Sequence, residues 1–142
     1  MSKVDVYLTF NGQCEEAFTF YASVFGEELQ QISRFRDMPP HPGMEIPEEA
    51  MGQVMHVSVP VGKESVLMGC DNPLAGERAT VMGNNFSLSF SADTKIDADR
   101  IFSALSAGGK ITMPMATTFW NSYFGMLKDK FGIGWMVSAN PE

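Results

Sequence analysis

The sequence predicts an α+β protein made of two tandem modules, each with the order strand, helix, strand, strand, strand (βαβββ). Two observations support this prediction. The order of strand-like and helix-like patterns in residues 1–73 recurs in residues 84–142, and residues 74–83 lack a clear period and would link the halves. Similar short stretches, residues 7–10 and 87–90, recur at a spacing of about eighty residues, far longer than a solenoid period. We expect one compact domain with a curved, cup-shaped mixed sheet and the helices outside.

The first strand and the first helix have the clearest patterns. Apolar and polar side chains alternate in residues 4–10, which is typical of a strand with one buried face. Residues 14–26 have apolar side chains at spacings of three and four, which give a helix one wide apolar face. Gly26 can end this helix in the left-handed conformation. The apolar face predicts a sheet beneath the helix, and it consists of Cys14, Ala17, Phe18, Tyr21, Val24 and Phe25.

The rest of the first module predicts three strands and a flap. Residues 28–35, 53–59 and 64–70 have the alternation of strands, and the last two would form a hairpin. Residues 37–47 contain four prolines and no period, so they predict a loop. Long loops of this kind are often functional, and we expect this flap to close over the cup. His41 lies in the flap and is expected to be an exposed loop residue.

The second module repeats the order of the first. Residues 85–91 predict a strand with one apolar and one small polar face. Residues 97–107 predict a helix, because Ile101, Phe102 and Leu105 fall at helical spacing. Three further strands are predicted at residues 110–118, 122–128 and 133–138.

Composition limits the classes of partner. The 142 residues carry 10 basic and 17 acidic side chains, a formal net charge of −7, which repels phosphate backbones and offers no basic face to anionic membranes. We therefore expect no nucleic acid and no membrane as a partner. The first residues lead directly into a strand pattern without an apolar signal sequence, so we expect a cytoplasmic protein. The two cysteines, Cys14 and Cys70, have no short spacing and are expected to be free thiols.

A set of motifs spread over nearly the whole chain carries a family resemblance. The motifs are Tyr7-Leu8, Glu15-Glu16-Ala17, Phe20-Tyr21, Phe25-Gly26, Met55-His56, Met68 with Asp71, Gly108-Gly109-Lys110, Met113-Pro114, Phe119-Trp120, Phe131-Gly132 and Trp135-Met136. With them the chain resembles the PhnB-like branch of the vicinal oxygen chelate superfamily, which includes glyoxalase I, bleomycin resistance proteins and dihydroxybiphenyl dioxygenases. The resemblance implies the glyoxalase/bleomycin resistance fold and a homodimer. The branch also carries the label of a demethylubiquinone methyltransferase, but the sequence has no glycine-rich nucleotide loop of the sort that a methyl-donor cofactor site generally needs.

The resemblance also implies where a metal ion would bind. In metal-using relatives, one position on the first strand and one on the last strand of each module supply His, Glu or Gln. Hard divalent cations bind to several carboxylate or imidazole ligands, and the thioethers of Met68 and Met136 are not ligands of this kind. We therefore expect neither the superfamily metal nor another cofactor. The corresponding residues here are Asp5, Met68, Asn85 and Met136, with Val6 or Ser87 as substitutes if a first strand slips by one residue.

Strand alternation suggests one candidate catalytic residue and a set of candidate ligand-binding residues. His56 can act as a general base or can be a structural, hydrogen-bonded imidazole. Cys70 beside Asp71 can become a nucleophile if both converge with His56. Methionine and aromatic side chains exceed what a small core needs, which suggests an adaptable apolar pocket, although core packing also explains them. The predicted ligand-binding residues are Tyr7, Thr9, His56, Met68, Cys70, Ser87, Ser89, Trp120 and Met136.

These observations lead to one main hypothesis about function and two alternatives. The main hypothesis is a small-molecule-binding protein of the glyoxalase/bleomycin resistance type that holds an apolar or aromatic ligand in its cup without a metal. The first alternative is a metal-dependent lyase, isomerase or dioxygenase whose ligands have moved to Asp5, His56 or Glu64. The second alternative is a structural dimer whose cup is filled with side chains. Whether the protein catalyses a reaction stays open at this level.

Overall fold

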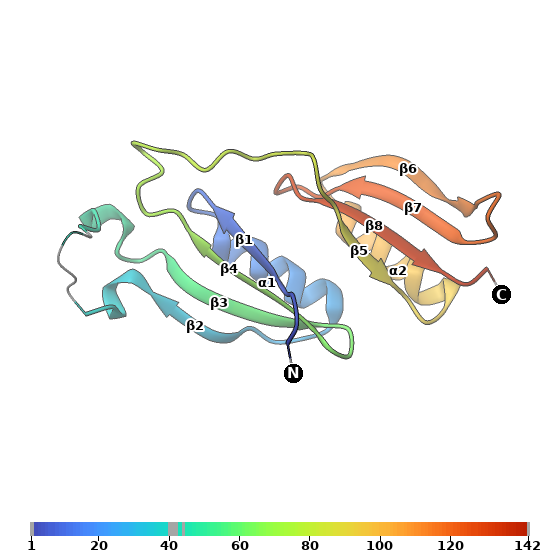
Figure 1. The fold of residues 1–142 in the computed structure, drawn as a ribbon, viewed down its shortest axis with the longest axis horizontal. Helices are drawn as coiled ribbons and strands as arrows, with labels where there is room; N and C mark the ends of the chain where they lie inside the picture. Colours follow the sequence, from blue (N-terminus) through green and yellow to red (C-terminus); the bar gives the residue numbers. More distant parts are fainter. Residues whose placement is uncertain (1, 40–42, 44, 142) are drawn as a thin grey trace. The chain divides into compact units, whose positions relative to one another are not determined.

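Residues 2–39, 43 and 45–141 are described here from a computed structural model of the chain. The chain divides into two compact units, unit 1 (Met1–Val81) and unit 2 (Met82–Glu142). Each unit has one α-helix packed on one four-stranded mixed sheet (Figure 1). The described residues thus form two α-helices and eight strands, and the predicted α+β class is confirmed.

Unit 1 contains β1 (Val6–Phe10), α1 (Cys14–Phe25), β2 (Gln30–Arg34), the short 3-10 helices η1 (Phe35–Asp37) and η2 (Glu48–Ala50), β3 (Val54–Val61) and β4 (Ser65–Asp71). The strand order in the sheet is β1, β4, β3, β2. β1 runs parallel to β4, whereas β3 is antiparallel to both of its neighbours. The chain therefore crosses over from β1 through α1 to the far edge of the sheet and returns strand by strand.

The apolar face of α1 lies against the sheet of unit 1. Phe18 and Tyr21 are fully buried, and their rings meet edge to face with centroids 5.7 Å apart. Gly69 in β4 makes room for the helix, because a Cβ atom at this position would lie 2.6 Å from Cε1 of Phe18. The helix ends at Gly26, whose φ of 66° is left-handed as predicted. α1 covers one face of the sheet, and the opposite face carries more exposed side chains such as Tyr7, which is 48% exposed.

Unit 2 contains β5 (Leu88–Ser91), α2 (Lys95–Ser106), β6 (Lys110–Thr117), β7 (Tyr123–Lys128) and β8 (Gly134–Ala139). The strand order is β5, β8, β7, β6, with β5 parallel to β8 and the other neighbours antiparallel. This arrangement repeats that of unit 1 strand for strand. The predicted duplication of a βαβββ module is therefore present in the fold.

Several predicted boundaries were wrong by a few residues. β1 begins at Val6 and not at residue 4, and β2 is Gln30–Arg34 and not residues 28–35. α2 begins at Lys95 and not at residue 97, because the side chain of Thr94 caps the helix by accepting a hydrogen bond of 3.1 Å from the N–H of Asp97. β3 continues to Val61, so the hairpin turn begins only at Gly62, whose φ of 71° suits a tight turn. β5 begins at Leu88 and not at residue 85.

Part of the predicted flap, residues 40–42 and 44, lies outside the described residues, and so does His41. The described residues contain no helix that is both long enough and apolar enough to cross a membrane. Both cysteines are free thiols, as predicted. Cys14 is buried and Cys70 is partly exposed.

Candidate functional site

Four of the predicted ligand-binding residues meet on the face of the unit 1 sheet opposite to α1. They come from three neighbouring strands: Tyr7 and Thr9 from β1, Cys70 from β4 and His56 from β3. The Tyr7 hydroxyl lies 3.4 Å from Nδ1 of His56, and the two ring centroids are 5.9 Å apart. Oγ1 of Thr9 lies 3.9 Å from Sγ of Cys70. We call these four residues the Tyr7 cluster.

The register of the sheet brings the cluster together. β1 and β4 are parallel, with Tyr7 opposite Met68. β3 and β4 are antiparallel, with Ser58 opposite Met68, so two residues further along this pair His56 lies opposite Cys70. Side chains two residues apart project from the same face of a strand. Met68, another predicted ligand-binding residue, therefore lies beside the cluster.

The surroundings of the Tyr7 hydroxyl raise its pKa to about 12. Partial burial is the main cause, because it penalises the phenolate form. The neighbouring Cys70 also raises this pKa, through its charge when ionised and through a side-chain hydrogen bond to Tyr7. Tyr7 therefore stays protonated at neutral pH. Its hydroxyl can donate a hydrogen bond to Nδ1 of His56 when the imidazole carries its proton on Nε2.

A cavity of about 420 Å³ lies at the end of β4, next to the Tyr7 cluster. Its volume falls within the range of small-molecule sites, and most of its described lining is apolar. Cys70 belongs both to this lining and to the cluster, so the two features are continuous. The described lining residues are Phe35, Gly43, Glu45, Ile46, Met55, Cys70, Asp71, Pro73, Leu74 and Arg78.

The loop that follows β4 provides one wall of the cavity. Oδ1 of Asn72 accepts a hydrogen bond of 2.9 Å from the N–H of Leu74, and Nδ2 of Asn72 donates one of 2.6 Å to the carbonyl of Arg78. The side chain of Asn11 pairs with the backbone of Thr80 through two hydrogen bonds, of 3.0 and 2.8 Å. Two asparagines thus fix the loop that carries Leu74 and Arg78.

Sequence reasoning missed most of the cavity. Leu74 and Arg78 fall in a stretch without a period, and Phe35 lies next to the flap, so none of them was predicted as a site residue. Met55 was noted in the Met55-His56 motif but was not predicted as a site residue. The signal that could have revealed the loop is Asn72 before Pro73, since an asparagine side chain readily closes a turn onto the backbone two residues later.

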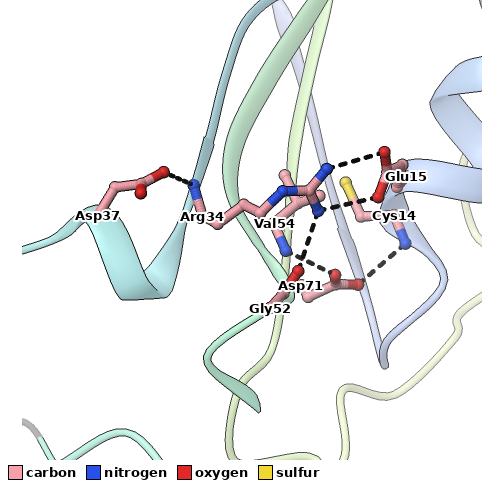
Figure 2. A network of polar contacts seen from close by, with 7 residues as sticks. All are labelled: Cys14, Glu15, Arg34, Asp37, Gly52, Val54 and Asp71. Carbon is pink, nitrogen blue, oxygen red and sulfur yellow. Dashed lines mark hydrogen bonds and ion pairs between the residues drawn. The ribbon is translucent and has the colours of Figure 1, made fainter.

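The carboxylate of Asp71 accepts hydrogen bonds from backbone N–H groups and is not part of the Tyr7 cluster. Oδ1 accepts a hydrogen bond of 2.9 Å from the N–H of Cys14, and Oδ2 accepts one of 3.0 Å from the N–H of Val54 (Figure 2). Oδ1 also accepts one of 2.9 Å from the N–H of Gly12. Asp71 is only 2% exposed. Its carboxylate ties β4 to the start of α1 and the start of β3. Within the Tyr7 cluster, His56 is contacted by Tyr7 and Cys70 by Thr9.

An ion pair between Arg34 and Glu15 lies close to these contacts of Asp71 (Figure 2). Nη1 and Nη2 of Arg34 each donate a hydrogen bond of 2.9 Å to the carboxylate of Glu15, and Nη1 also donates one of 3.0 Å to the carbonyl of Gly52 (Figure 2). The hydrogen bond from Arg34 lowers the pKa of Glu15. Arg34 thus connects the end of β2 with the first turn of α1 and with the chain before β3.

The other predicted ligand-binding residues lie in unit 2. Ser89 in β5 is opposite Met136 in β8, so the structure makes these two residues neighbours. Ser87 lines a smaller cavity of about 140 Å³. Trp120 lies in the loop between β6 and β7, is 56% exposed, and meets the ring of Phe119 edge to face with centroids 4.8 Å apart.

Residues 2–138 match the protein family described as 3-demethylubiquinone-9 3-methyltransferase. The chain belongs to this family. Its relative Protein YjdN of Escherichia coli (strain K12) is 30% identical over 142 residues, which cover 94% of this chain and 92% of that protein. Protein PA1353 from Pseudomonas aeruginosa has a crystal structure that is 35% identical, with a TM-score of 0.82 over 99% of this chain and 98% of that one. The PhnB protein from Bacillus cereus, described as a putative member of the same methyltransferase group, is 27% identical, with a TM-score of 0.75 over 97% and 99% of the two chains.

The predicted resemblance to PhnB-like proteins is thus confirmed. Two solved proteins of the glyoxalase/bleomycin resistance/dioxygenase type match it with TM-scores of 0.63 and 0.66 at identities of 19% and 15%. At such low identity the likeness concerns the fold alone. It confirms the predicted glyoxalase/bleomycin resistance fold.

Two of the four positions implied for a metal ion carry thioethers, which are poor ligands for a hard cation. Asp5 already forms an ion pair with Lys3, with an N–O distance of 3.3 Å. Met68 and Met136 offer only thioethers, and Asn85 offers only an amide oxygen. In the part of the chain that the structure describes, no three His, Cys, Asp or Glu side chains are grouped as a metal site requires. These residues do not fit the superfamily metal.

Proposed function

We propose that this protein binds a small apolar or aromatic molecule in the unit 1 cavity, as a metal-independent protein of the glyoxalase/bleomycin resistance type. The observation that carries this proposal is the position of Cys70, which lines the cavity and belongs to the Tyr7 cluster. An apolar space beside a few convergent polar groups is how small-molecule sites are generally built. The family description names methyl transfer. The sequence has no glycine-rich nucleotide loop for a methyl donor, so we propose binding and not methyl transfer.

The two parts of the site would recognise different parts of a ligand. Phe35, Met55 and Leu74 give the cavity an apolar lining, and the flexible thioether of Met55 can adapt to ligands of different shape. The charged side chains of Glu45 and Arg78 belong to the lining as well. Beside the cavity, the Tyr7 hydroxyl and the imidazole of His56 suit a carbonyl or hydroxyl oxygen. The favoured ligand is therefore a compact apolar or aromatic body with one polar oxygen. Phenyl alkyl ketones are simple probes of this class.

Binding of such a probe is expected to stabilise the fold. At a concentration of benzylacetone (4-phenylbutan-2-one) ten times its Kd, the midpoint of thermal unfolding should rise by about 3–6 °C, because a ligand that binds only the folded state stabilises it by roughly 1.4 kcal/mol. Leu74→Asp should abolish this rise, since it places a charge in the apolar wall. Thermal unfolding followed by circular dichroism measures both.

The matched control is Val81→Asp, which introduces the same charge at a side chain that is 88% exposed and outside the cavity lining. This variant should keep the full rise. An equal rise in Leu74→Asp would show that the probe binds elsewhere and would contradict the proposal. No rise with benzylacetone or with shorter and longer phenyl alkyl ketones would favour the structural dimer with a filled cup.

The protein is also expected to bind without a metal ion. After exposure to Ni, Zn, Fe or Mn and gel filtration, metal analysis should find far less than one ion per chain, because thioether and amide ligands hold these divalent cations poorly. A chelator should leave the benzylacetone effect unchanged. One retained ion per chain that is lost in Asp5→Asn or His56→Gln would instead support the metal-dependent lyase, isomerase or dioxygenase with relocated ligands.

A further inference from the structure

The smaller cavity of unit 2, of about 140 Å³, has polar and charged groups in its lining that the proposed function does not use. A Cβ atom at Gly125 in β7 would lie 2.8 Å from Cε1 of Phe102 in α2, so Gly125 faces the helix. Lys128, three residues later in the same strand, therefore faces away from the helix. The cavity thus opens on the face of the sheet opposite to α2. The polar side chains in its lining are those of Asn84, Ser87, Thr112 and Lys128.

One row of paired positions crosses the sheet at this cavity. Lys110 in β6 pairs with Lys128 in β7, and Lys128 pairs with Gly134 in β8. Directly paired residues project their side chains from the same face of a sheet. A Cβ atom at Gly134 would lie 3.2 Å from Oγ of Ser87, so the row continues to this hydroxyl. The missing side chain of Gly134 leaves space between the ammonium group of Lys128 and the hydroxyl of Ser87.

The two lysines of this row lack a partner of opposite charge. Neither Lys110 nor Lys128 forms an ion pair with any described residue. The neighbouring carboxylate of Asp129 is buried, and it accepts hydrogen bonds of 2.8 Å from the N–H of Phe131 and of 2.9 Å from Nε1 of Trp135. Like charges directly opposite each other on neighbouring strands repel. A bound anion would relieve this repulsion.

The charge of unit 2 is compatible with an anionic ligand. Residues 82–142 carry five acidic and five basic side chains, so the net charge of −7 comes from residues 1–81. The lysine pair is held in place by a close approach of the backbone. A Cβ atom at Gly109, just before β6, would clash with the carbonyl oxygen of Lys128. Lys110 is thus kept beside Lys128 at the cavity.

We propose that the unit 2 cavity binds a phosphate group, as the free ion or as a monoester of a small molecule. Two ammonium groups favour a doubly charged anion over a carboxylate, and lysine commonly binds phosphate. The tetrahedral oxygens can accept hydrogen bonds from Lys128 on one side of the empty Gly134 position and from the Ser87 hydroxyl on the other. A cavity of about 150 Å³ holds a molecule as large as benzene, so a phosphate group fits. No residue of the unit 1 cavity takes part, so the site is independent of the proposed function.

Other classes of ligand suit this row less well. A metal cation would be repelled by the two ammonium groups, which have no lone pair to offer when charged. A neutral apolar molecule would cover Lys128, Ser87 and Asn84 without giving them hydrogen-bond partners, which costs free energy. Phosphate supplies both the negative charge and the acceptor oxygens.

Titration with inorganic phosphate at constant ionic strength tests the proposal. In ¹H–¹⁵N spectra of the whole chain, the amide signals of Ser87, Lys128 and Gly134 should shift and saturate with a single Kd. Sodium chloride at the same ionic strength should not shift them. Phenyl phosphate distinguishes the two sources of the group, because its ring can also contact Phe86 in the lining. Tighter binding than that of inorganic phosphate assigns a monoester, equal or weaker binding assigns the free ion, and both results support the site.

Two variants and a matched control separate the cavity from general electrostatic attraction. Lys128→Gln should raise the Kd for phosphate by about tenfold or more, because hydrogen bonds to charged groups are the strong ones. Gly134→Ala keeps every charge but places a methyl group in the space beside Ser87, and it should weaken binding to a similar extent. Lys63→Gln changes the net charge by the same amount at an exposed lysine between β3 and β4, and it should leave the Kd unchanged. The dispersion of the spectra verifies that each variant is folded.

Three results would overturn the proposal. The first is the absence of a saturable shift in the wild-type protein. The second is the same Kd in the wild type and in Lys128→Gln, since binding would then not need the lysine pair. The third is an unchanged Kd in Gly134→Ala, which would place phosphate on the open surface and not in the cavity. The proposed function would stand in all three cases, because the benzylacetone experiment measures the unit 1 cavity.

Discussion

Asp71→Ala is expected to lower the free energy of unfolding by about 3–5 kcal/mol, because it leaves three backbone N–H groups without their acceptor. The carboxylate is 2% exposed, so water would reach these groups poorly. α1 has no side-chain cap of its own, and the Asp71 carboxylate takes this place from 57 residues away. A negative charge at the start of a helix is also favourable to the helix dipole. Urea unfolding followed by circular dichroism measures the loss.

Asp37→Ala is the matched control for this prediction. Asp37 is an exposed carboxylate whose Oδ2 accepts a hydrogen bond of 3.0 Å from the N–H of Arg34 (Figure 2). Its removal should cost no more than about 1 kcal/mol, since water can replace an exposed acceptor. Asp71→Asn should fall between the two, because the amide keeps one acceptor oxygen. An equal loss of unfolding free energy in the two alanine variants would show that Asp71 does not stabilise the junction of β4 with the starts of α1 and β3.

The order of the elements was predictable from the sequence because it depends on local spacing. Alternation in residues 4–10 and helical spacing in residues 14–26 are properties of neighbouring residues, and β1 and α1 lie within these ranges. Boundaries were less accurate where a cap or a turn decides them. Because Thr94 caps α2, this helix begins earlier than the apolar spacing indicates. β3 ends later than its alternation indicates, just before the turn at Gly62.

The candidate site was predictable only in part, because it depends on contacts between distant residues. Strand alternation placed Tyr7, His56 and Cys70 on side-chain faces that can meet, but the contact between Tyr7 and His56 needs the register of three strands, which no local pattern contains. The same holds for Asp71, whose partners lie far along the chain. Leu74 was missed because its loop is fixed by single asparagines and has no period.

Gly69→Ala is expected to destabilise the protein by about 3 kcal/mol, the upper end of the usual cost of overpacking a core. A Cβ atom at this position would lie 2.6 Å from Cε1 of Phe18 and 2.8 Å from the carbonyl oxygen of Leu8. Phe18 is fully buried and cannot swing away, and Leu8 pairs with Gly69 across the sheet. The methyl group must therefore push α1 away from β4 or push β1 out of register. The loss is measured by urea unfolding.

Two variants decide whether the close approach of α1 to β4 is the cause. Gly76→Ala adds the same methyl group where no heavy atom lies within 4 Å, so it should change stability little. Phe18→Leu shortens the side chain that the new Cβ would strike, at its own cost in buried area. If the helix contact causes the loss, Gly69→Ala should cost less in the Phe18→Leu background than in the wild type, since residues in contact are not additive. Strict additivity would place the strain at the Leu8 carbonyl, and the damage would then lie in the pairing of β1 with β4, the strands that carry Tyr7 and Cys70.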